Sequence, residues 1–512
     1  MKRTTISLIA VAAALAAVTG VASVTAPEAP TKTEAKAPER MPVERSSLVC
    51  PAPSSSELAE TDYTSFTPAG AAGEAKEGSA ELTASAAALA DPKKTDGKKT
   101  DTKTSKTAKK PDPGKPLLAL KEPGKPVAAK ESGADAPALV GAATGRLAPG
   151  WTAQQTTKVT AGGARGLLGV SCTAPGTDFW FPGASLAKER QDYVHLTNPD
   201  DTAAVADIEL YGKDGALKTT LNDGIPVPAG SSVPVLLSTL TSERAADVTV
   251  HVTTRSGRVG AVVRAADDAV GSDWIAASAD PAGTAVLPGI PADATSVQLV
   301  AFAPGEADAD LKIQLAGPGG RITPAGHETL HVKSGMTASV DLADVTKGEA
   351  GSLILSPSQA GRATPVVAGL RVVRGKGDDK EVAFIPATAP VGARATAADN
   401  RAKGSVLSLT APGAAAQVKV TASAGTEGGA QTVKTFTVKA GTTLAVPPPV
   451  PDGLKGSYAL TVETESGGPV HASRTLELPE DGIPMFTVQT LPDDRGTVAV
   501  PQAEQDLSVL DD

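Results

Sequence analysis

The sequence predicts an all-β protein with three tandem Ig-like antiparallel β-sandwich repeats, a small N-terminal β unit and a disordered insert. Short runs of alternating apolar and polar residues, bounded by Gly, Pro, Asp and Asn, recur from residue 178 to 501, as in antiparallel strands. Sequence markers return every 105 residues or so, which suits an Ig-like sandwich of about 100 residues. No long stretch of 178–501 keeps a helical apolar period free of Gly and Pro, so a helical fold is disfavoured.

The first 26 residues have the features of an export segment. Lys2 and Arg3 precede an uncharged 19-residue run, Ile6 to Val24, and Val24-Thr25-Ala26 resembles a cleavage site. The run is long for a signal peptide and short for a spanning helix; we favour cleavage, with an uncleaved membrane anchor as the alternative. We expect a secreted or cell-envelope protein, with a flexible Pro-, Glu- and Lys-rich stalk at 27–45.

If the protein is exported, its two cysteines are expected to form a disulfide, because cysteines in an oxidising compartment usually pair. Cys50 and Cys172 each follow a short apolar run and stand shortly before Ala-Pro, as if two neighbouring strands ended side by side. The sequence therefore predicts a Cys50–Cys172 disulfide, with two buried free thiols as the alternative. No His or second Cys lies near either one, so no metal site is expected there.

A low-complexity insert at 67–135 separates two N-terminal β segments, 46–66 and 137–177. It has few large apolar residues and is predicted to be disordered. Within 91–130, twelve Lys stand against four Asp and one Glu, a net charge of +7, so the rest of the chain carries −9 − 7 = −16. One interpretation is a soluble linker. The other is a basic tether for anionic wall polymers or lipid headgroups, formed by Lys93, Lys94, Lys98, Lys99, Lys109 and Lys110.

The repeats are predicted at 178–285, 286–385 and 386–501, before an acidic tail at 502–512. Pro199, Pro304 and Pro412 each follow a predicted strand, in steps of 105 and 108. A second marker, Gly230, Gly335 and Gly441, recurs in steps of 105 and 106. Two markers in one order indicate an internal repeat.

Catalytic and cofactor motifs find little support. Ser185 and Lys188 match the Ser-x-x-Lys pattern of penicillin-interacting enzymes, but no companion motif accompanies them and they fall in a predicted loop. The five His are scattered, and no metal or cofactor is expected. The net charge of −9 gives no nucleic-acid signature.

Three residues of the first repeat are candidate binding residues: Trp180, Phe181 and Asn198. Phe179-Trp180-Phe181 is either an aromatic platform for carbohydrate or a cap on the first sandwich core. Strand alternation places at least one of the three outward, and Trp180 is the candidate we expect to be exposed.

The motifs Ser171-Cys172, Trp180-Phe181-Pro182-Gly183, Leu196-Thr197-Asn198-Pro199 and Tyr211-Gly212-Lys213-Asp214-Gly215 resemble those of an uncharacterised secreted family of actinobacteria, domain of unknown function 5719. The resemblance covers about 46–501 apart from the Lys-rich insert. It implies a tandem β-sandwich envelope protein without an assigned activity. The second and third repeats lack the Trp-Phe and Asn-Pro elements, so any role for these motifs extends only to the first repeat.

These observations predict an exported, non-enzymatic envelope protein that acts as a scaffold or interaction module. The partner would be an envelope protein or a cell-wall polymer. One alternative is a module that binds a wall glycan or an anionic polymer; a degenerate serine hydrolase built on Ser185 and Lys188 is the other.

Overall fold

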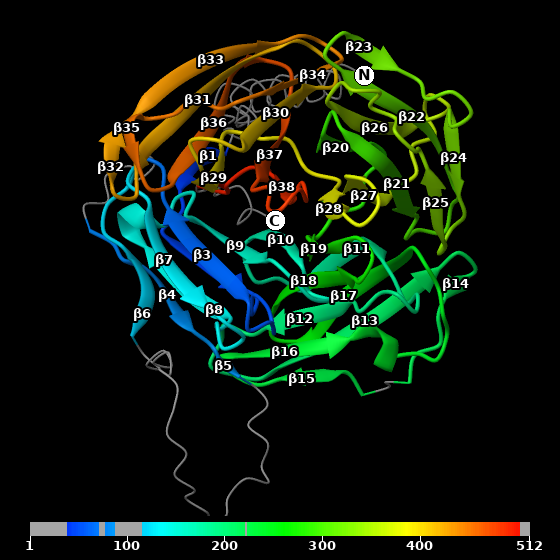
Figure 1. The fold of residues 1–512 in the computed structure, drawn as a ribbon, viewed down its shortest axis with the longest axis horizontal. Helices are drawn as coiled ribbons and strands as arrows, with labels where there is room; N and C mark the ends of the chain where they lie inside the picture. The colour runs from blue at the N-terminus through cyan, green and yellow to red at the C-terminus, as the bar shows by residue number, and fades with distance from the viewer. Residues whose placement is uncertain (1–37, 71–76, 88–114, 221–222, 502–512) are drawn as a thin grey trace, which may run out of the picture. The chain divides into compact units, whose positions relative to one another are not determined.

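The computed structural model describes residues 38–70, 77–87, 115–220 and 223–501 (Figure 1). Their regular elements are strands, apart from the short 3₁₀ helices η1 (Gly145–Leu147) and η2 (Leu237–Thr239). Nearly all strand pairs are antiparallel, which confirms the predicted all-β class. Within these ranges no helix is long and apolar enough to cross a membrane. The predicted export segment, the six tether lysines and the acidic tail lie outside the described residues.

The chain divides into two compact units, 42–498 and the two chain ends (1–41 with 499–512). Strand β1 (Glu39–Pro42) pairs with β39 (Thr497–Val500) in a two-stranded sheet.

The first sandwich of the unit 42–498 consists of two four-stranded sheets, β2-β8-β4-β6 and β10-β9-β3-β7. We call it the N-terminal sandwich. Its strands are β2 (Arg45–Cys50), β3 (Ala59–Phe66), β4 (Ala80–Ala84), β6 (Pro116–Leu120), β7 (Val127–Ser132), β8 (Leu139–Thr144), β9 (Thr152–Val159) and β10 (Gly166–Ser171). The short β5 (Ala86–Ala87) pairs in parallel with β16 of the next sandwich.

Three further sandwiches follow in chain order, and we call them repeats 1, 2 and 3. Repeat 1 contains β11 (Asp178–Ala184), β12 (Tyr193–Thr197), β13 (Ala204–Gly212), β14 (Gly215–Ala216), β15 (Ile225–Val227), β16 (Ser231–Leu236), β17 (Val248–Ser256), β18 (Gly260–Asp267) and β19 (Gly271–Ile275). Repeat 2 contains β20 (Ala285–Ile290), β21 (Ala294–Phe302), β22 (Ala309–Gly317), β23 (Gly320–Ile322), β24 (Thr329–Val332), β25 (Thr337–Asp341), β26 (Gly351–Pro357), β27 (Val367–Arg374) and β28 (Glu381–Pro386). Repeat 3 contains β29 (Ala395–Asn400), β30 (Ser405–Ala411), β31 (Ala416–Gly425), β32 (Gly428–Ala430), β33 (Thr432–Val438), β34 (Thr442–Val446), β35 (Asp452–Lys455), β36 (Tyr458–Gly467), β37 (His471–Glu477) and β38 (Phe486–Thr490).

All four sandwiches share one strand order. In each, the first strand lies at the edge of one sheet and the last strand at the edge of the other, as in β11-β17-β13 and β19-β18-β12-β16. The N-terminal sandwich follows the same plan, with β2-β8-β4 and β10-β9-β3-β7. It is therefore a further copy of the repeat, interrupted by the Lys-rich segment.

The prediction that all of 67–135 is disordered is wrong, because β4, β5, β6 and β7 lie within it. Leu82, Leu118 and Leu120 are buried in the core of the N-terminal sandwich. Leu118 and Leu120 are two apart, so they face the same side of a strand. The average composition of 67–135 is polar, so it does not reveal these few leucines, which nevertheless complete the core of the N-terminal sandwich.

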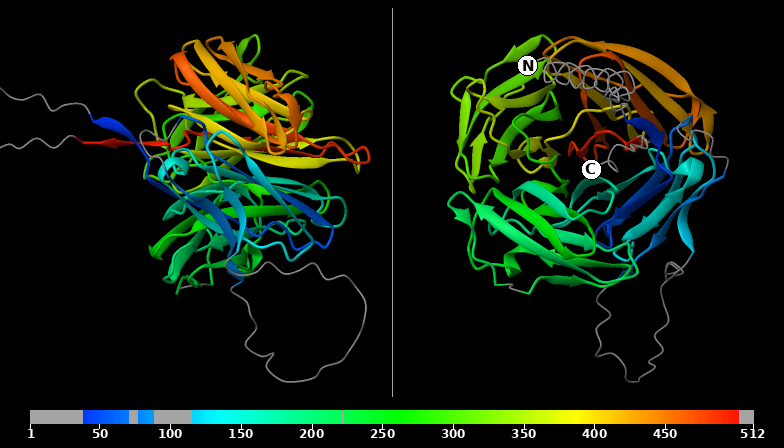
Figure 2. Two further views of the ribbon diagram at one scale, coloured as in Figure 1. Left: turned by 90° about the vertical axis from the view of Figure 1, so that its left-hand side faces the viewer. Right: turned by 180° about the vertical axis from the view of Figure 1, so that it is seen from behind.

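The last strands of the four sandwiches contact one another in a closed cycle: β10 with β19, β19 with β28, β28 with β38, and β38 with β10. Figure 1, and the view from behind in Figure 2, show these strands towards the middle of the unit, with the other strands outside them. Close approach requires glycine at one point, since a Cβ at Gly169 of β10 would overlap the side chains of Gln489 and Thr487 in β38.

Candidate functional site

A cavity of about 460 Å³ lies where the four last strands end. Its lining comes from segments within 169–179, 274–280, 386–389 and 488–495, with Leu48, Trp151, Thr152 and Thr396. These segments contain the ends of β10, β19, β28 and β38 and the linkers that follow them. Because the last strands end at the same place, the linkers meet there; we call this the axial cavity. Loops on a rigid β-scaffold are a common location for binding sites.

The charges around the axial cavity are mostly negative. Four aspartates line it, with one arginine, Arg495. Asp178 keeps 60% of its side chain exposed and lies 3.4 Å from His251 Nε2, and Asp280 is also exposed. The carboxylate of Asp493 accepts hydrogen bonds from the backbone N–H groups of Ala393 and Arg495. The fourth aspartate, Asp494, is held by Arg394.

The wall of the axial cavity also contains polar atoms that lack a hydrogen-bond partner. Gln489 is 5% exposed, and its Nε2 donates to Thr487 Oγ1 while its Oε1 has no donor. Trp274 Nε1 and Ser278 Oγ are likewise buried without partners. These three atoms belong to residues that line the cavity, but the atoms themselves are covered by protein.

Beneath the cavity, the buried Asp273 of repeat 1 joins three sandwiches. Its carboxylate accepts the Gly169 N–H of the N-terminal sandwich at 3.0 Å and the Thr487 hydroxyl of repeat 3 at 3.0 Å. Burial raises the pKa of Asp273 well above its usual value, partly offset by these hydrogen bonds, and the nearby Glu381 raises the pKa further. Burial thus disfavours the charged form of this carboxyl, and the hydrogen bonds offset part of that effect.

Glu381, the first residue of β28, forms a second junction between sandwiches. Its Oε1 accepts the Leu167 N–H at 3.0 Å, and its Oε2 has no partner. Burial raises the pKa of Glu381 to about 8, although the Leu167 N–H and Arg165 lower it. Gly271, with φ of 104°, leaves room for this carboxyl, because a Cβ there would lie 2.9 Å from Glu381 Oε2.

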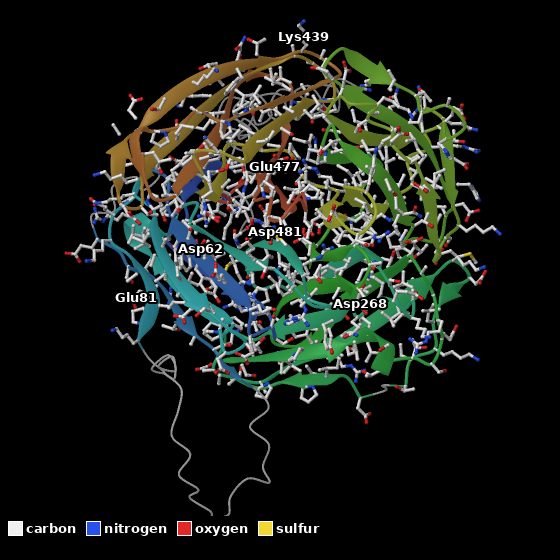
Figure 3. All side chains as sticks on the ribbon, viewed as in Figure 1. Asp62, Glu81, Asp268, Lys439, Glu477 and Asp481 are labelled. Carbon is white, nitrogen blue, oxygen red and sulfur yellow. A yellow bond between two sulfur atoms is a disulfide. The ribbon has the colours of Figure 1, made fainter. Side chains whose placement is uncertain are left out.

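A wider crevice of about 620 Å³ lies between the N-terminal sandwich and repeat 3. Figure 3 labels two of its lining residues, Asp62 and Glu477. Arg401 bonds Asp62 at 2.8 Å, and Lys158 bonds Glu480 at 3.2 Å. Both pairs join repeat 3 to the N-terminal sandwich, so these charges close the cycle of sandwiches. Because these charged residues are already paired with one another across the crevice, the axial cavity is the better candidate for a ligand site.

The predicted disulfide between Cys50 and Cys172 is confirmed. Val49 and Thr173 exchange backbone hydrogen bonds of 2.9 and 3.0 Å beside it, so the segments carrying the two cysteines do lie side by side. The disulfide ties β2 to the end of β10 and places Cys172 in the lining of the axial cavity.

The expectation that Trp180 is exposed is wrong. Only 9% of this residue is exposed. Its ring stacks on His251 at 3.6 Å and contacts Phe302 of repeat 2 at 5.3 Å. The aromatic residue that faces the axial cavity is its neighbour Phe179, which is partly exposed. Alternation along β11 does turn Trp180 away from the core of repeat 1, but repeat 2 covers its ring. Phe179 lies on the same strand face as Phe181 and is partly exposed at the start of the strand.

We expect Trp180→Ala to lower the free energy of unfolding by about 3–5 kcal/mol, the usual loss for a buried aromatic side chain. Urea unfolding followed by circular dichroism measures this loss. Phe179→Ala, at the partly exposed neighbour, is the matched control and should cost much less. Equal losses for the two variants would contradict the packing role of Trp180 between repeats 1 and 2.

Phe181 and Asn198, the other two candidate binding residues, have structural contacts. Phe181 is fully buried in the core of repeat 1. The Asn198 side chain donates to the carbonyls of Thr202 at 2.8 Å and Val227 at 3.0 Å, and its Oδ1 accepts the Asp200 N–H. Asn198 therefore holds a turn, and neither residue presents its side chain to a ligand.

The Ser-x-x-Lys pattern lies in the loop between β11 and β12. Ser185 is buried and its Oγ accepts the Ala187 N–H, whereas Lys188 is exposed. In the described part of the chain, no cluster of three or more His, Cys, Asp or Glu side chains is suited to hold a metal ion.

Sequence reasoning missed an arginine that recurs in the strand before each last strand of the three repeats: Arg264, Arg371 and Arg474. The steps are 107 and 103 residues, so the spacing that identified the repeats also contained this signal. Arg371 reaches Asp267 of repeat 1 at 3.3 Å, and Arg474 donates to Gln154 of the N-terminal sandwich at 2.8 Å. Burial lowers the pKa of Arg474 to about 10.

Comparison with known proteins identifies one family that matches this chain. A comparison with curated proteins finds no match. A family of unknown function (DUF5719) matches residues 127–449, from β7 to just beyond β34. The match is shorter than the resemblance seen in the sequence, but it covers more than half of the 512 residues. The chain therefore belongs to the family of unknown function DUF5719.

Proposed function

We propose that this protein is an exported, non-enzymatic component of the cell envelope that presents one binding site on a rigid assembly of sandwiches. The observation that carries the proposal is the convergence of four linkers on the axial cavity. Contacts through Asp273, Glu381 and Arg474 fix the sandwiches against one another. A rigid support of this kind suits an interaction module, because little freedom is lost when a ligand binds.

The extracytoplasmic location rests on the disulfide and on the export features of the sequence. Disulfides persist in oxidising compartments and are rare in the cytosol, so the Cys50–Cys172 bond supports export.

Cell fractionation combined with maleimide labelling under denaturing conditions tests the location. We expect the protein in the envelope or medium, with both cysteines unreactive until a reductant is added. A cytosolic protein with two reactive thiols would overturn this part of the proposal. Treatment of the same fraction with a fluorescent β-lactam tests the serine hydrolase alternative, and we expect no label on Ser185.

A wall glycan is the partner that the axial cavity favours over an anionic polymer, because aspartates outnumber basic residues in its lining. Co-sedimentation of the oxidised full chain with purified cell wall tests this binding. We expect saturable binding that persists when the salt concentration is raised. Salt screens attraction between charges, and binding of a neutral ligand does not depend on such attraction. Loss of all binding at moderate salt would instead favour the basic tether as the wall-binding element.

A further inference from the structure

We infer that the axial cavity binds a neutral saccharide, with Phe179 as its stacking platform and with Asp280 as a hydrogen-bond acceptor. The inference rests on the proposed binding function and names the ligand class and the residues that recognise it. A volume of about 460 Å³ lies within the range of small-molecule sites, about 300–1,000 Å³.

Three lining residues carry buried polar atoms without a partner, and these atoms are compatible with a hydroxylated ligand. Gln489 Oε1 needs a hydrogen-bond donor, Trp274 Nε1 needs an acceptor, and Ser278 Oγ can take either. A ligand with hydroxyl groups supplies both kinds of partner, whereas an ammonium group supplies donors alone. All three atoms are covered in this structure, so their side chains must rotate before a ligand can reach them.

The rim charges select the same chemistry. The carboxylates of Asp178 and Asp280 repel negative charge, that of Asp280 can accept hydrogen bonds, and Arg495 is the one basic residue in the lining. Sugar hydroxyls donate well to carboxylates, since hydrogen bonds to ionised acceptors are the stronger kind. Phosphate-bearing or uronic polymers would meet repulsion here.

Phe179 supplies the apolar surface that a sugar ring requires. It is partly exposed, and it lines the cavity next to Asp178 on β11. Its ring packs against Phe181 at 6.4 Å with an interplanar angle of 18°, so its orientation is fixed by the core of repeat 1. Because the ring is already fixed, it loses little conformational entropy when the C–H face of a sugar stacks on it.

Isothermal titration calorimetry of the oxidised full chain tests the inference with five probes: mannotetraose, cellotetraose, chitotetraose, poly-glutamate and tetralysine. We expect saturable binding of at least one neutral oligosaccharide and none of poly-glutamate. Phe179→Ala and Asp280→Asn should each weaken that binding about tenfold, a change equivalent to about 1.4 kcal/mol. Ile322→Ala and Asp268→Asn, at exposed positions outside the cavity, are the matched controls and should bind as the wild type does.

The wall co-sedimentation assay separates failure of this inference from failure of the proposed function. If Phe179→Ala and Asp280→Asn sediment with cell wall as the wild type does, the protein binds wall by another surface and the inference is wrong. Binding of poly-glutamate, or tighter binding of tetralysine than of every sugar, would also overturn it. Absence of both wall and sugar binding would overturn the proposed function together with the inference.

Discussion

Glu381→Gln should make the protein more stable than the wild type at alkaline pH. In the folded protein, burial raises the pKa of Glu381 to about 8, against a usual value of 4.5. The folded state therefore keeps a proton that the unfolded chain releases, so this group's stabilisation is complete below pH 4.5 and is lost as the pH rises through about 8. The shift corresponds to about 5 kcal/mol. Gln is neutral at every pH and retains an acceptor for the Leu167 N–H.

Urea unfolding at pH 5, 7 and 9 measures this effect. We expect the wild type to lose stability across the series and Glu381→Gln to lose much less, with the two proteins most similar at pH 5. Glu306→Gln, on an exposed turn between β21 and β22, is the matched control and should follow the wild type. Parallel curves for Glu381→Gln and the wild type would show that the carboxyl is not buried between the sandwiches.

Removal of the disulfide should lower the free energy of unfolding by a similar amount. The double variant Cys50→Ala/Cys172→Ala releases a covalent loop with a sequence separation of 122 residues. In the chain-entropy account, closing so long a loop stabilises the folded state by about 5 kcal/mol, because it restricts the unfolded chain. The N-terminal sandwich should be destabilised most, because both cysteines belong to it and the Lys-rich segment lengthens the loop that they close.

Hydrogen exchange and urea unfolding of the double variant measure this loss. We expect the greatest gain in exchange in β2, β8 and β10, with repeat 3 the least affected. The reduced wild type is the control, and it should unfold at the same urea concentration as the double variant. A loss under 1 kcal/mol in both samples would show that the N-terminal sandwich is held by its noncovalent packing alone.

The internal repeat could be predicted from sequence because turn residues respond to local geometry. Pro199, Pro304 and Pro412 recur at a nearly constant spacing, and each stands just after the second strand of its sandwich. The N-terminal copy escaped detection because the Lys-rich segment stretches its spacing and dilutes its apolar residues. Leu118 and Leu120 nevertheless complete its core.

The candidate site was only partly predictable. The aromatic triplet at the start of repeat 1 predicted one exposed ring, and the cysteine context predicted the covalent link beside the cavity. Trp180 turns away from the core of repeat 1 as alternation predicts, but Phe302, far away in sequence, packs on it and buries it. The functional interpretation of Asn198 failed because a polar side chain that satisfies backbone carbonyls cannot be distinguished in sequence from one that binds a ligand.

Local sequence patterns predicted the all-β class and the Cys50–Cys172 pair. Strand alternation and turn residues depend on neighbouring residues, and the context of each cysteine indicated the pair. Three features could be seen only in the folded chain: the N-terminal unit is another sandwich, the last strands contact one another in a cycle, and four linkers surround one cavity. Those outcomes depend on contacts between residues more than 100 positions apart, such as Asp273 with Thr487 and Gln154 with Arg474. Neither partner of such a contact carries a local pattern that identifies the other.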